Sequence, residues 1–544
     1  MRKIISWKQN KKIIIILVLV LIFLLHAVNN YIIVEKDTTP LLVDMPGHFE
    51  KGVRFHSTLD QGFNVFVNNY LKHTHNYPPL FMLSSVPLYW LFGVSPDVGV
   101  MTNMFYLAIL LLSVFFIGRK IANNTVGLLA AFIVSVFPSV FGFSRVYMLD
   151  FALTAMVALS ICLLLYTDYF RNRLFSILFG VAFGLSFLTK YNAPIFVVGP
   201  LIAYFFYSFN IKKLFSKKGF VNYKKQLSNL GVALILTVLL SLIWAVPHLG
   251  GYIEMITYFS SQDLASEGGP LFYIHFLLNT MSLFFVIVFI LSLILIILYF
   301  VRLRHKVPDS EKKTLLLLLL WFIIPFLFFT SFEISAASSR WVLPYISVFA
   351  LLIGFGISKI RPIKLMEGIM LLIVLLGLLQ FFLISYGFIN QKESYTIYEF
   401  GLLSPHNDDW KVEAFFETIE RTRDNKTSLF IFTTQPTHIT SYLAVTGSSR
   451  GYAKGYDIYD LTRTARKGGI SNLSSELLFF LQEADYILYT KQPQIENITS
   501  DLFKNISDIT YKFLEQRNSE LIKVNDFIFP DNTYVIMYKR VVYE

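Results

Sequence analysis

The chain has 544 residues, of which 55% are hydrophobic and only 15% are charged, and its formal net charge is +11. A soluble protein of this size could not bury so much apolar surface, whereas a protein with several membrane spans need not. The basic residues cluster in short loops between apolar runs, which is typical of membrane proteins and argues against nucleic-acid binding. The single cysteine, Cys162, lies inside an apolar run, so no disulfide framework or cysteine-based metal site is available.

Apolar runs long enough to cross a bilayer recur along the first 388 residues. The first, residues 13–33, follows a basic N-terminal segment and has no small-residue cleavage site after it. We therefore expect a retained signal anchor with a cytoplasmic N-terminus. The later runs lie near residues 99–118, 124–142, 151–168, 174–189, 193–209, 229–246, 274–301, 314–331, 341–358 and 365–388. The pattern predicts a polytopic α-helical membrane protein with about eleven transmembrane helices.

The charges of the loops give this topology a test that it could have failed. When the loops are assigned alternately to the two sides, the basic clusters all fall on the cytoplasmic side, whereas the external loops hold only scattered basic residues. The clusters lie at residues 119–120, 171–173, 212–225, 302–313 and 359–364. We therefore expect a multi-pass membrane protein with everything after residue 389 on the extracytoplasmic side. The sequence leaves periplasm, cell surface and organelle lumen open for that side, and we take the plasma membrane as the preferred location.

The last part of the chain, residues 390–544, changes to the composition of a soluble domain. Helix-like segments alternate there with strand-like ones, and residues 527–541 have the pattern of a hairpin. This alternation predicts a small extracytoplasmic α/β domain, separate from a membrane domain at residues 1–389. The segment has no glycine-rich phosphate loop and no metal-ligand spacing, so we expect it to cover or position a site in the membrane domain.

The first external loop, residues 34–98, holds several residues suited to catalysis or binding. Asp44 follows the first span, and a carboxylate near the bilayer surface can act as a general base on a hydroxyl group. The alternative for Asp44 is a solvated loop acid or a helix cap. The loop also holds His48, His75 and a Tyr-Pro-Pro-Leu sequence that begins at Tyr77, where the proline pair forces an extended backbone.

Further charged residues lie at the ends of later spans on the same side. Asp150 opens the fourth span, where an ordinary N-terminal cap is the alternative to a second catalytic acid. Arg145 could pair with Asp150 or contact a phosphate, whose geometry a guanidinium group matches. Lys190 and Arg340 add two cations, although a lysine at a span end often only extends toward the interface. Charges of both signs at one membrane surface predict a site for a charged lipid.

Five short motifs resemble those of a known family when they are taken in order. They are the acid after the first span, Tyr-Pro-Pro-Leu at 77–80, Arg-x-x-Met-x-Asp at 145–150, Leu-Thr-Lys-x-x-Ala-Pro at 188–194 and Ser-Arg-Trp-Val-Leu-Pro at 339–344. Over about residues 1–360 the chain resembles the integral-membrane GT-C glycosyltransferases. Within them it is most similar to the protein O-mannosyltransferase and aminoarabinose transferase group.

The resemblance implies a polyprenyl-phosphate-linked sugar donor and an acceptor hydroxyl on a glycan, lipid or protein at the outer face. It identifies Asp44 with the family's catalytic first-loop acid and Asp150 with its second acid. It also assigns Lys190 and Arg340 to the lipid phosphate. Attack on the sugar from the face opposite the phosphate would invert the anomeric carbon.

One departure from the family pattern concerns metal binding. Many members carry Asp-Glu in the first loop, whereas Asp44 is followed by Met45. A divalent metal is therefore possible but not favoured, although His48 and His75 could supply ligands. We expect no certain cofactor.

Two other functions remain open from the sequence. A transporter of lipid-linked sugars would place charged or broken segments in the middle of the bilayer, often in repeated halves, and the charges here lie at span ends. A cell-surface polysaccharide polymerase or ligase predicts a large external loop between late spans, whereas the large external loop here comes first.

Overall fold

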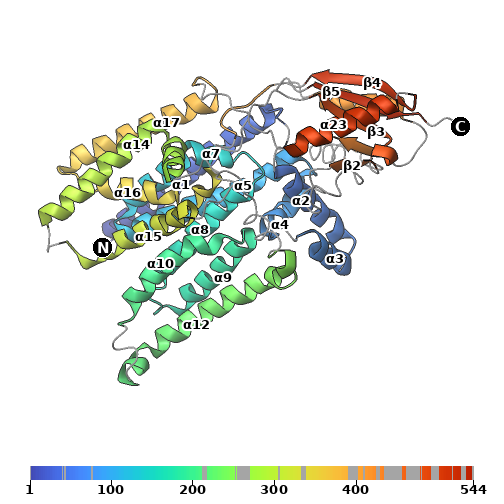
Figure 1. Ribbon diagram of the computed structural model, residues 1–544. Helices are drawn as coiled ribbons and strands as arrows, with labels where there is room; N and C mark the ends of the chain where they lie inside the picture. The colour runs from blue at the N-terminus through green and yellow to red at the C-terminus, as the bar shows by residue number, and fades with distance from the viewer. Residues whose placement is uncertain are drawn as a thin grey trace. The chain divides into compact units, whose positions relative to one another are not determined.

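The computed structural model describes residues 2–39, 41, 44–74, 77–210, 217–251, 253, 270–303, 307–331, 339–389, 402–407, 411–423, 429–433, 456–460, 478, 481–491, 501–517, 519–528 and 534–541 (Figure 1). The chain divides into two compact units. The first comprises Met1–Val34, Lys51–Gly93 and Asp97–Ser404, and the second comprises Glu35–Glu50, Val94–Pro96 and Pro405–Glu544. The predicted division after residue 389 stays a prediction, and residues 390–401 lie outside the described part.

The first unit is built from helices, because its apolar runs leave the backbone no partner in a bilayer except itself. The helices of the membrane part and its loops are α1 (Arg2–Lys36), α2 (Met45–Asp60), α3 (Phe63–His73), α4 (Leu80–Phe92), α5 (Pro96–Ile121), α6 (Asn124–Ser135), α7 (Pro138–Phe143), α8 (Leu149–Tyr166), α9 (Arg173–Thr189), α10 (Ala193–Ser208), α12 (Lys217–Ala245), α14 (Pro270–Leu303), α15 (Asp309–Ser331), η2 (Ser339–Trp341), η3 (Leu343–Tyr345), α16 (Ser347–Ile357) and α17 (Ile363–Ser385) (Figure 1).

Each of the eleven predicted apolar runs coincides with helical structure, so the polytopic helical architecture is confirmed. Among the described residues, seven helices are long and apolar enough to cross a membrane, and five apolar helices of 10–17 residues are shorter. The number of spans therefore stays a prediction. The run predicted at 124–142 is divided into α6 and α7, because Pro138 cannot continue the helix and holds Phe137 in an extended conformation.

Glycines let several of these helices approach closely. A Cβ atom at Gly180 of α9 would overlap the backbone of Ala233 in α12. A Cβ atom at Gly199 of α10 would similarly overlap the backbone of Leu320 in α15. Small residues at such crossings are typical of membrane bundles, because packing rather than hydrophobic burial drives helix association in lipid.

The second unit contains a five-stranded mixed sheet, as expected for a small α/β domain. Its strands are β1 (Leu429–Thr433), β2 (Tyr456–Asp460), β3 (Tyr486–Lys491), β4 (Leu521–Ile528) and β5 (Tyr534–Arg540). Their order is β2-β1-β3-β5-β4, with β1 parallel to β2 and β3, and β5 antiparallel to β3 and β4. The predicted hairpin corresponds to β4 and β5, and β4 begins at Leu521 rather than at the predicted residue 527.

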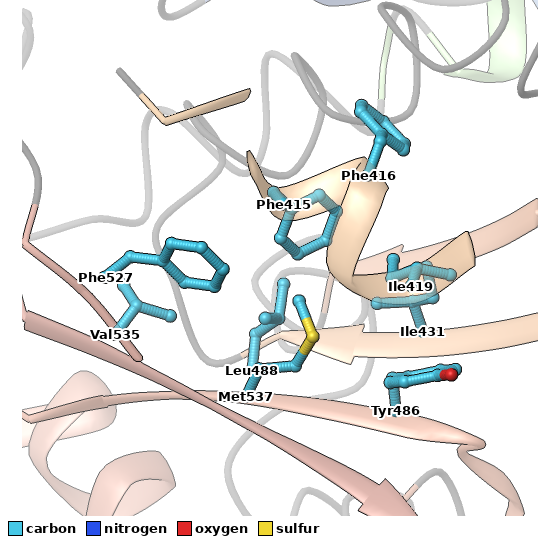
Figure 2. Packing of buried hydrophobic residues seen from close by; sticks show 9 residues of the cluster. All are labelled: Phe415, Phe416, Ile419, Ile431, Tyr486, Leu488, Phe527, Val535 and Met537. Atoms are coloured by element: carbon cyan, nitrogen blue, oxygen red, sulfur yellow. The ribbon is translucent and has the colours of Figure 1, made fainter. Parts of the chain in front are cut away.

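Helices α19 (Val412–Thr422) and α23 (Asp501–Gln516) pack on opposite faces of this sheet. Successive side chains of β3 alternate between the faces, as the pleat of a strand requires. Tyr486 and Leu488 face the core under α19, whereas Ile487 and Tyr489 face the core under α23. Figure 2 shows the first core, formed by Phe415, Phe416, Ile419, Ile431, Tyr486, Leu488, Phe527, Val535 and Met537.

Candidate functional site

Asp150 and Lys190 form a buried ion pair in the first unit. Asp150 lies in the first turn of α8, which begins after the extended residue Met148, and Lys190 is the extended residue that ends α9. Lys190 Nζ lies 2.8 Å from Asp150 Oδ1, and the two side chains are 7% and 3% exposed. Each charge also suits its helix end, because a helix N-terminus favours an anion and a C-terminus favours a cation.

This pair differs from one of the two possibilities that the sequence left open for Arg145. Arg145 is five residues before Asp150 and was considered as its partner, but the carboxylate pairs with Lys190, forty residues away along the chain. The close sequence neighbour fails because the backbone turns into α8 between the two residues, and the first turn of that helix directs Asp150 toward the end of α9.

Arg145 lies in a different, fully protein-lined environment. Its Nε donates to Asn30 Oδ1 at 2.9 Å and its Nη2 donates to Ser385 Oγ at 2.8 Å. Its Nη1 donates to the carbonyl oxygens of Leu402 and Leu403 at 3.3 and 2.6 Å. All three guanidinium nitrogens thus meet protein acceptors and join α1, the turn before α8, α17 and residues 402–403. This arrangement favours a structural role for Arg145 over the predicted phosphate contact.

A row of aromatic rings begins beside Lys190. Tyr191 stacks on Tyr77, with ring centroids 6.1 Å apart and planes 16° apart, and on Trp244, at 6.2 Å and 10°. Trp244 stacks in turn on His248, at 5.6 Å and 19°. Lys51 Nζ lies 5.7 Å from the centroid of the Tyr77 ring. The predicted Tyr-Pro-Pro-Leu residue Tyr77 is therefore placed next to the residue that follows Lys190.

Hydrogen bonds fix the far end of this row to residues 70–74, which lie in the predicted first external loop. Trp244 Nε1 donates to the carbonyl oxygen of Thr74 at 2.8 Å, and Thr74 Oγ1 lies 3.0 Å from His248 Nε2. The hydroxyl of Tyr70 donates to the carbonyl oxygen of Ile243 at 3.0 Å. These contacts tie residues 70–74 to the end of α12, so Trp244 and His248 position the loop segment that leads to Tyr77.

Sequence reasoning missed this part of the site. Trp244 lies near the end of the span predicted at 229–246 and His248 lies just beyond it, where an aromatic residue is ordinarily explained by the membrane interface. The only signal available was that a tryptophan and a histidine lie four residues apart, a spacing that would place them on one face if the predicted helix continued. Thr74 carries no signal at all in the sequence.

Two predicted residues, Asp44 and His48, belong to the second unit. Asp44 precedes α2, and its carbonyl oxygen accepts from the backbone N–H of His48 at 3.0 Å, so Asp44 lies at the start of that helix. Nearby, Asp37 Oδ1 accepts from the backbone N–H of His406 at 2.9 Å and from Thr39 Oγ1 at 3.0 Å. Burial raises the pKa of Asp37 to about 6 and outweighs these hydrogen bonds.

The remaining predicted residues are placed more simply. Arg340 is half-buried in η2, beside Trp341, which stacks on Phe329 at 5.2 Å. His75 lies outside the described residues. Within the described part of the chain, no group of three or more histidine, cysteine, aspartate or glutamate side chains could hold a metal ion.

Comparison with known proteins identifies a matching segment within this site. Residues 76–244 match the family described as dolichyl-phosphate-mannose-protein mannosyltransferase. The segment includes the Asp150–Lys190 pair and the stacked rings of Tyr77, Tyr191 and Trp244. No curated protein matches the sequence.

Several solved structures share the fold at low sequence identity. The apo structure of ArnT from Cupriavidus metallidurans is 13% identical with a TM-score of 0.55, and the same protein bound to undecaprenyl phosphate is 12% identical with a TM-score of 0.56. Each comparison covers 95% of this chain and 97% of that one. A third structure is the oligosaccharyltransferase AglB from Archaeoglobus fulgidus in complex with an inhibitory peptide and a dolichol-phosphate. It is 11% identical with a TM-score of 0.53, and the comparison covers 97% of this chain and 74% of that one. The expected GT-C fold is thus confirmed, and within it the chain carries a segment that matches the mannosyltransferase family.

Proposed function

We propose that the protein is an inverting glycosyltransferase of the plasma membrane that serves cell-envelope glycosylation. It transfers a sugar from a polyprenyl-phosphate donor to a hydroxyl acceptor on a glycan, lipid or protein at the outer face. In this proposal the N-terminus is cytoplasmic and the α/β domain is extracytoplasmic. The fold shared with ArnT, which has been solved with undecaprenyl phosphate bound, supports a lipid-phosphate donor.

The observation that carries the proposal is the Asp150–Lys190 pair inside the matched segment. A buried ion pair is costly to desolvate and is weak evidence for stability, so its presence calls for another reason. Buried charges at the end of membrane helices usually mark a functional site. Here the pair adjoins the stacked Tyr77 and Tyr191 rings, and both belong to the segment that matches the mannosyltransferase family.

The reaction needs one base and stabilisation of one leaving group. The acceptor oxygen forms a bond to the anomeric carbon while the bond from that carbon to the phosphate oxygen breaks, and the electron pair leaves with the phosphate. The proton of the acceptor hydroxyl goes to Asp44, which acts as the general base. Because the lipid phosphate is a good leaving group, cations suffice to stabilise the charge that it gains, and a separate general acid is not required.

Lys190 and Arg340 are the cations assigned to the phosphate. Asp150 fixes the position of Lys190, since Nζ lies 2.8 Å from its carboxylate. An ammonium group has three N–H donors, so the bond to Asp150 is compatible with a phosphate oxygen as a further acceptor. Asp150 then acts as a positioning residue for the cation. The bilayer holds the prenyl chain, so that the protein has to orient only the head group.

The test is transfer from a panel of radiolabelled polyprenyl-phosphate sugars by the purified protein, with crude membranes as the source of acceptors. Asp44→Asn should lower transfer by roughly 10²–10⁴-fold, the usual contribution of a general base. Asp60→Asn is the matched control, because Asp60 is an exposed acid at the last residue of α2, the helix that Asp44 precedes. It should leave transfer unchanged.

The outcomes separate the proposal from its alternatives. Full activity of a folded Asp44→Asn variant would remove the base from the mechanism. Failure of the wild type to consume any lipid-phosphate sugar would overturn the transferase itself and favour a transporter. A product whose anomeric configuration matches that of the donor, measured by NMR, would exclude inversion.

A further inference from the structure

A strained loop lies between α8 and α9, at the end of the bundle where the predicted cytoplasmic loops fall. Asp168, Tyr169 and Phe170 all have left-handed backbone conformations, with φ of 49°, 56° and 60°. Residues with a Cβ adopt this region at a cost, and three in succession are rare. Such strain persists only where the surroundings enforce it, and it is often found at ligand-binding positions.

Side chains from two other helices hold this loop in place. The hydroxyl of Tyr204 in α10 accepts from the backbone N–H of Tyr169 at 2.9 Å. Gln226 Nε2 and Asn229 Nδ2 of α12 donate to the carbonyl oxygens of Tyr169 and Phe170 at 2.9 and 2.8 Å. The Tyr169 ring also stacks on the Tyr204 ring, with centroids 5.0 Å apart and planes 9° apart. The strained backbone therefore presents the Tyr169 ring in one fixed orientation.

Two cations share this ring. Arg171 Cζ lies 5.9 Å from the centroid of Tyr169, and Lys313 Nζ lies 5.7 Å from it. Lys313 Nζ also lies 5.3 Å from the centroid of Tyr207. Attraction to the face of a ring accounts for each cation separately, but two like charges gathered about one ring repel each other. An anion in contact with both cations would offset that repulsion.

Neighbouring cations at this end have carboxylate partners, and these two do not. Lys312 pairs with Asp309 at 3.3 Å, and Lys359 pairs with Glu311 at 3.0 Å, so both acids of the first turn of α15 are engaged. Among the residues that the structure describes, neither Lys313 nor Arg171 has a carboxylate within ion-pair distance. Asp168, the acid of the loop itself, is exposed to solvent.

We propose that Lys313 and Arg171, held about the Tyr169 ring, bind the phosphate group of an anionic phospholipid in the adjacent leaflet. Guanidinium and ammonium groups are the usual protein ligands of phosphate. Tyrosine side chains with an apolar ring and a polar hydroxyl suit the depth of lipid headgroups. The site uses none of the residues assigned to the proposed reaction and does not depend on that activity.

The position of Lys313 identifies a lipid rather than free phosphate as the ligand. Lys313 is in the second turn of α15, whose residues Asp309–Thr330 are long and apolar enough to cross a membrane. A residue at the very start of a spanning helix lies at the depth of the headgroups. Anionic lipids of the leaflet also concentrate near basic side chains there.

The experiment is native mass spectrometry of the full-length protein in detergent that contains either phosphatidylglycerol or phosphatidylcholine. The site variant is Lys313→Gln with Arg171→Gln. The control is Lys224→Gln with Lys225→Gln, which removes the same charge from two exposed lysines of α12 at the same end of the bundle. Thermal unfolding of both variants shows whether either has lost its fold. A variant with Lys313→Arg in place of Lys313→Gln should recover binding, because it restores a cation at that position.

Wild type and control should retain bound phosphatidylglycerol, whereas the site variant should bind it at least about tenfold more weakly, since it loses two charge-assisted contacts. The wild type, the control and the site variant should not differ in their retention of phosphatidylcholine. Equal retention of phosphatidylglycerol by the site variant and the control would overturn the site. An equal loss in both variants would also overturn it, because diffuse attraction to basic residues would then explain binding. Displacement of the lipid by millimolar inorganic phosphate would overturn the assignment to a lipid.

Discussion

Lys190 and Arg145 are both buried cations of the first unit, yet different kinds of acceptor hold them. Lys190 is 6% exposed and pairs with the carboxylate of Asp150 between the ends of two helices. Arg145 is 1% exposed, and its three nitrogens meet amide, hydroxyl and carbonyl oxygens. The rings of Phe141 and Phe381 lie 4.7 and 5.8 Å from its Cζ.

The difference teaches that burial of a charge does not by itself identify a site. Arg145 satisfies its donors entirely within the protein and connects four segments, which is the behaviour of a structural anchor. Lys190 forms a buried ion pair beside a row of stacked rings, and such a pair is weak evidence for stability, so we infer a functional use for the cation. Three variants test this contrast, from the largest expected effect to the smallest.

Asp150→Asn should have the largest effect, because it leaves the Lys190 ammonium buried without its carboxylate. We expect a loss of stability of about 3–5 kcal/mol together with a loss of transfer. The double variant Asp150→Asn with Lys190→Met should regain most of the stability, since both charges are then absent, but none of the transfer. Thermal unfolding in detergent and turnover per folded molecule measure the two effects. A double variant that is stable and fully active would reduce the pair to a structural role.

Arg145→Met should destabilise the protein without impairing the chemistry of the molecules that fold. The change leaves the acceptors on Asn30, Ser385 and residues 402–403 without their donor, at a cost of roughly 2–4 kcal/mol. Arg145→Lys should recover only part of this, because an ammonium group cannot reproduce the planar arrangement of donors. A stable but inactive Arg145→Met variant would contradict the structural role of Arg145, because it would indicate contact with the substrate.

Trp244→Phe should have the smallest effect of the three. It keeps an aromatic ring beside Tyr191 but removes the hydrogen bond from Nε1 to Thr74, worth about 1 kcal/mol. Since the bond positions the loop that leads to Tyr77, we expect a rise in KM of a few-fold with little change in kcat. Trp321→Phe is the matched control, because Trp321 is equally buried and its Nε1 has no hydrogen-bond partner among the described residues. If both variants behaved alike, the bond to Thr74 would have no positioning role.

The fold could be predicted where a local pattern determines the structure. Long apolar runs become helices in a bilayer because no other structure satisfies their backbone groups, and all eleven predicted runs are helical. The alternation of helix-like and strand-like segments near the C-terminus similarly predicted an α/β domain. The order of its strands could not be predicted, because β1 pairs with both β2 and β3 through contacts between distant residues.

Several residues of the candidate site stand out in the sequence, whereas their pairing does not, and their roles stay predictions. Asp150, Lys190 and Tyr77 are recognisable because charged residues and a proline pair stand out at span ends. The sequence left open whether Arg145 pairs with Asp150 or contacts a phosphate, and the start of α8 directs the two side chains to different neighbours. Trp244 was missed because an aromatic residue at a span end has a common and simpler explanation.

The sequence by itself determined the membrane class, the helical spans and the set of charged residues that can do chemistry, because each follows from hydropathy or from the charge of one residue. Only the tertiary structure decided which charges meet. The packing of α8 against α9 makes Lys190 the partner of Asp150, and the end of α12 brings Trp244 to Tyr191. The physical reason is that pairing depends on the directions of side chains from segments far apart in the chain, which no local pattern records.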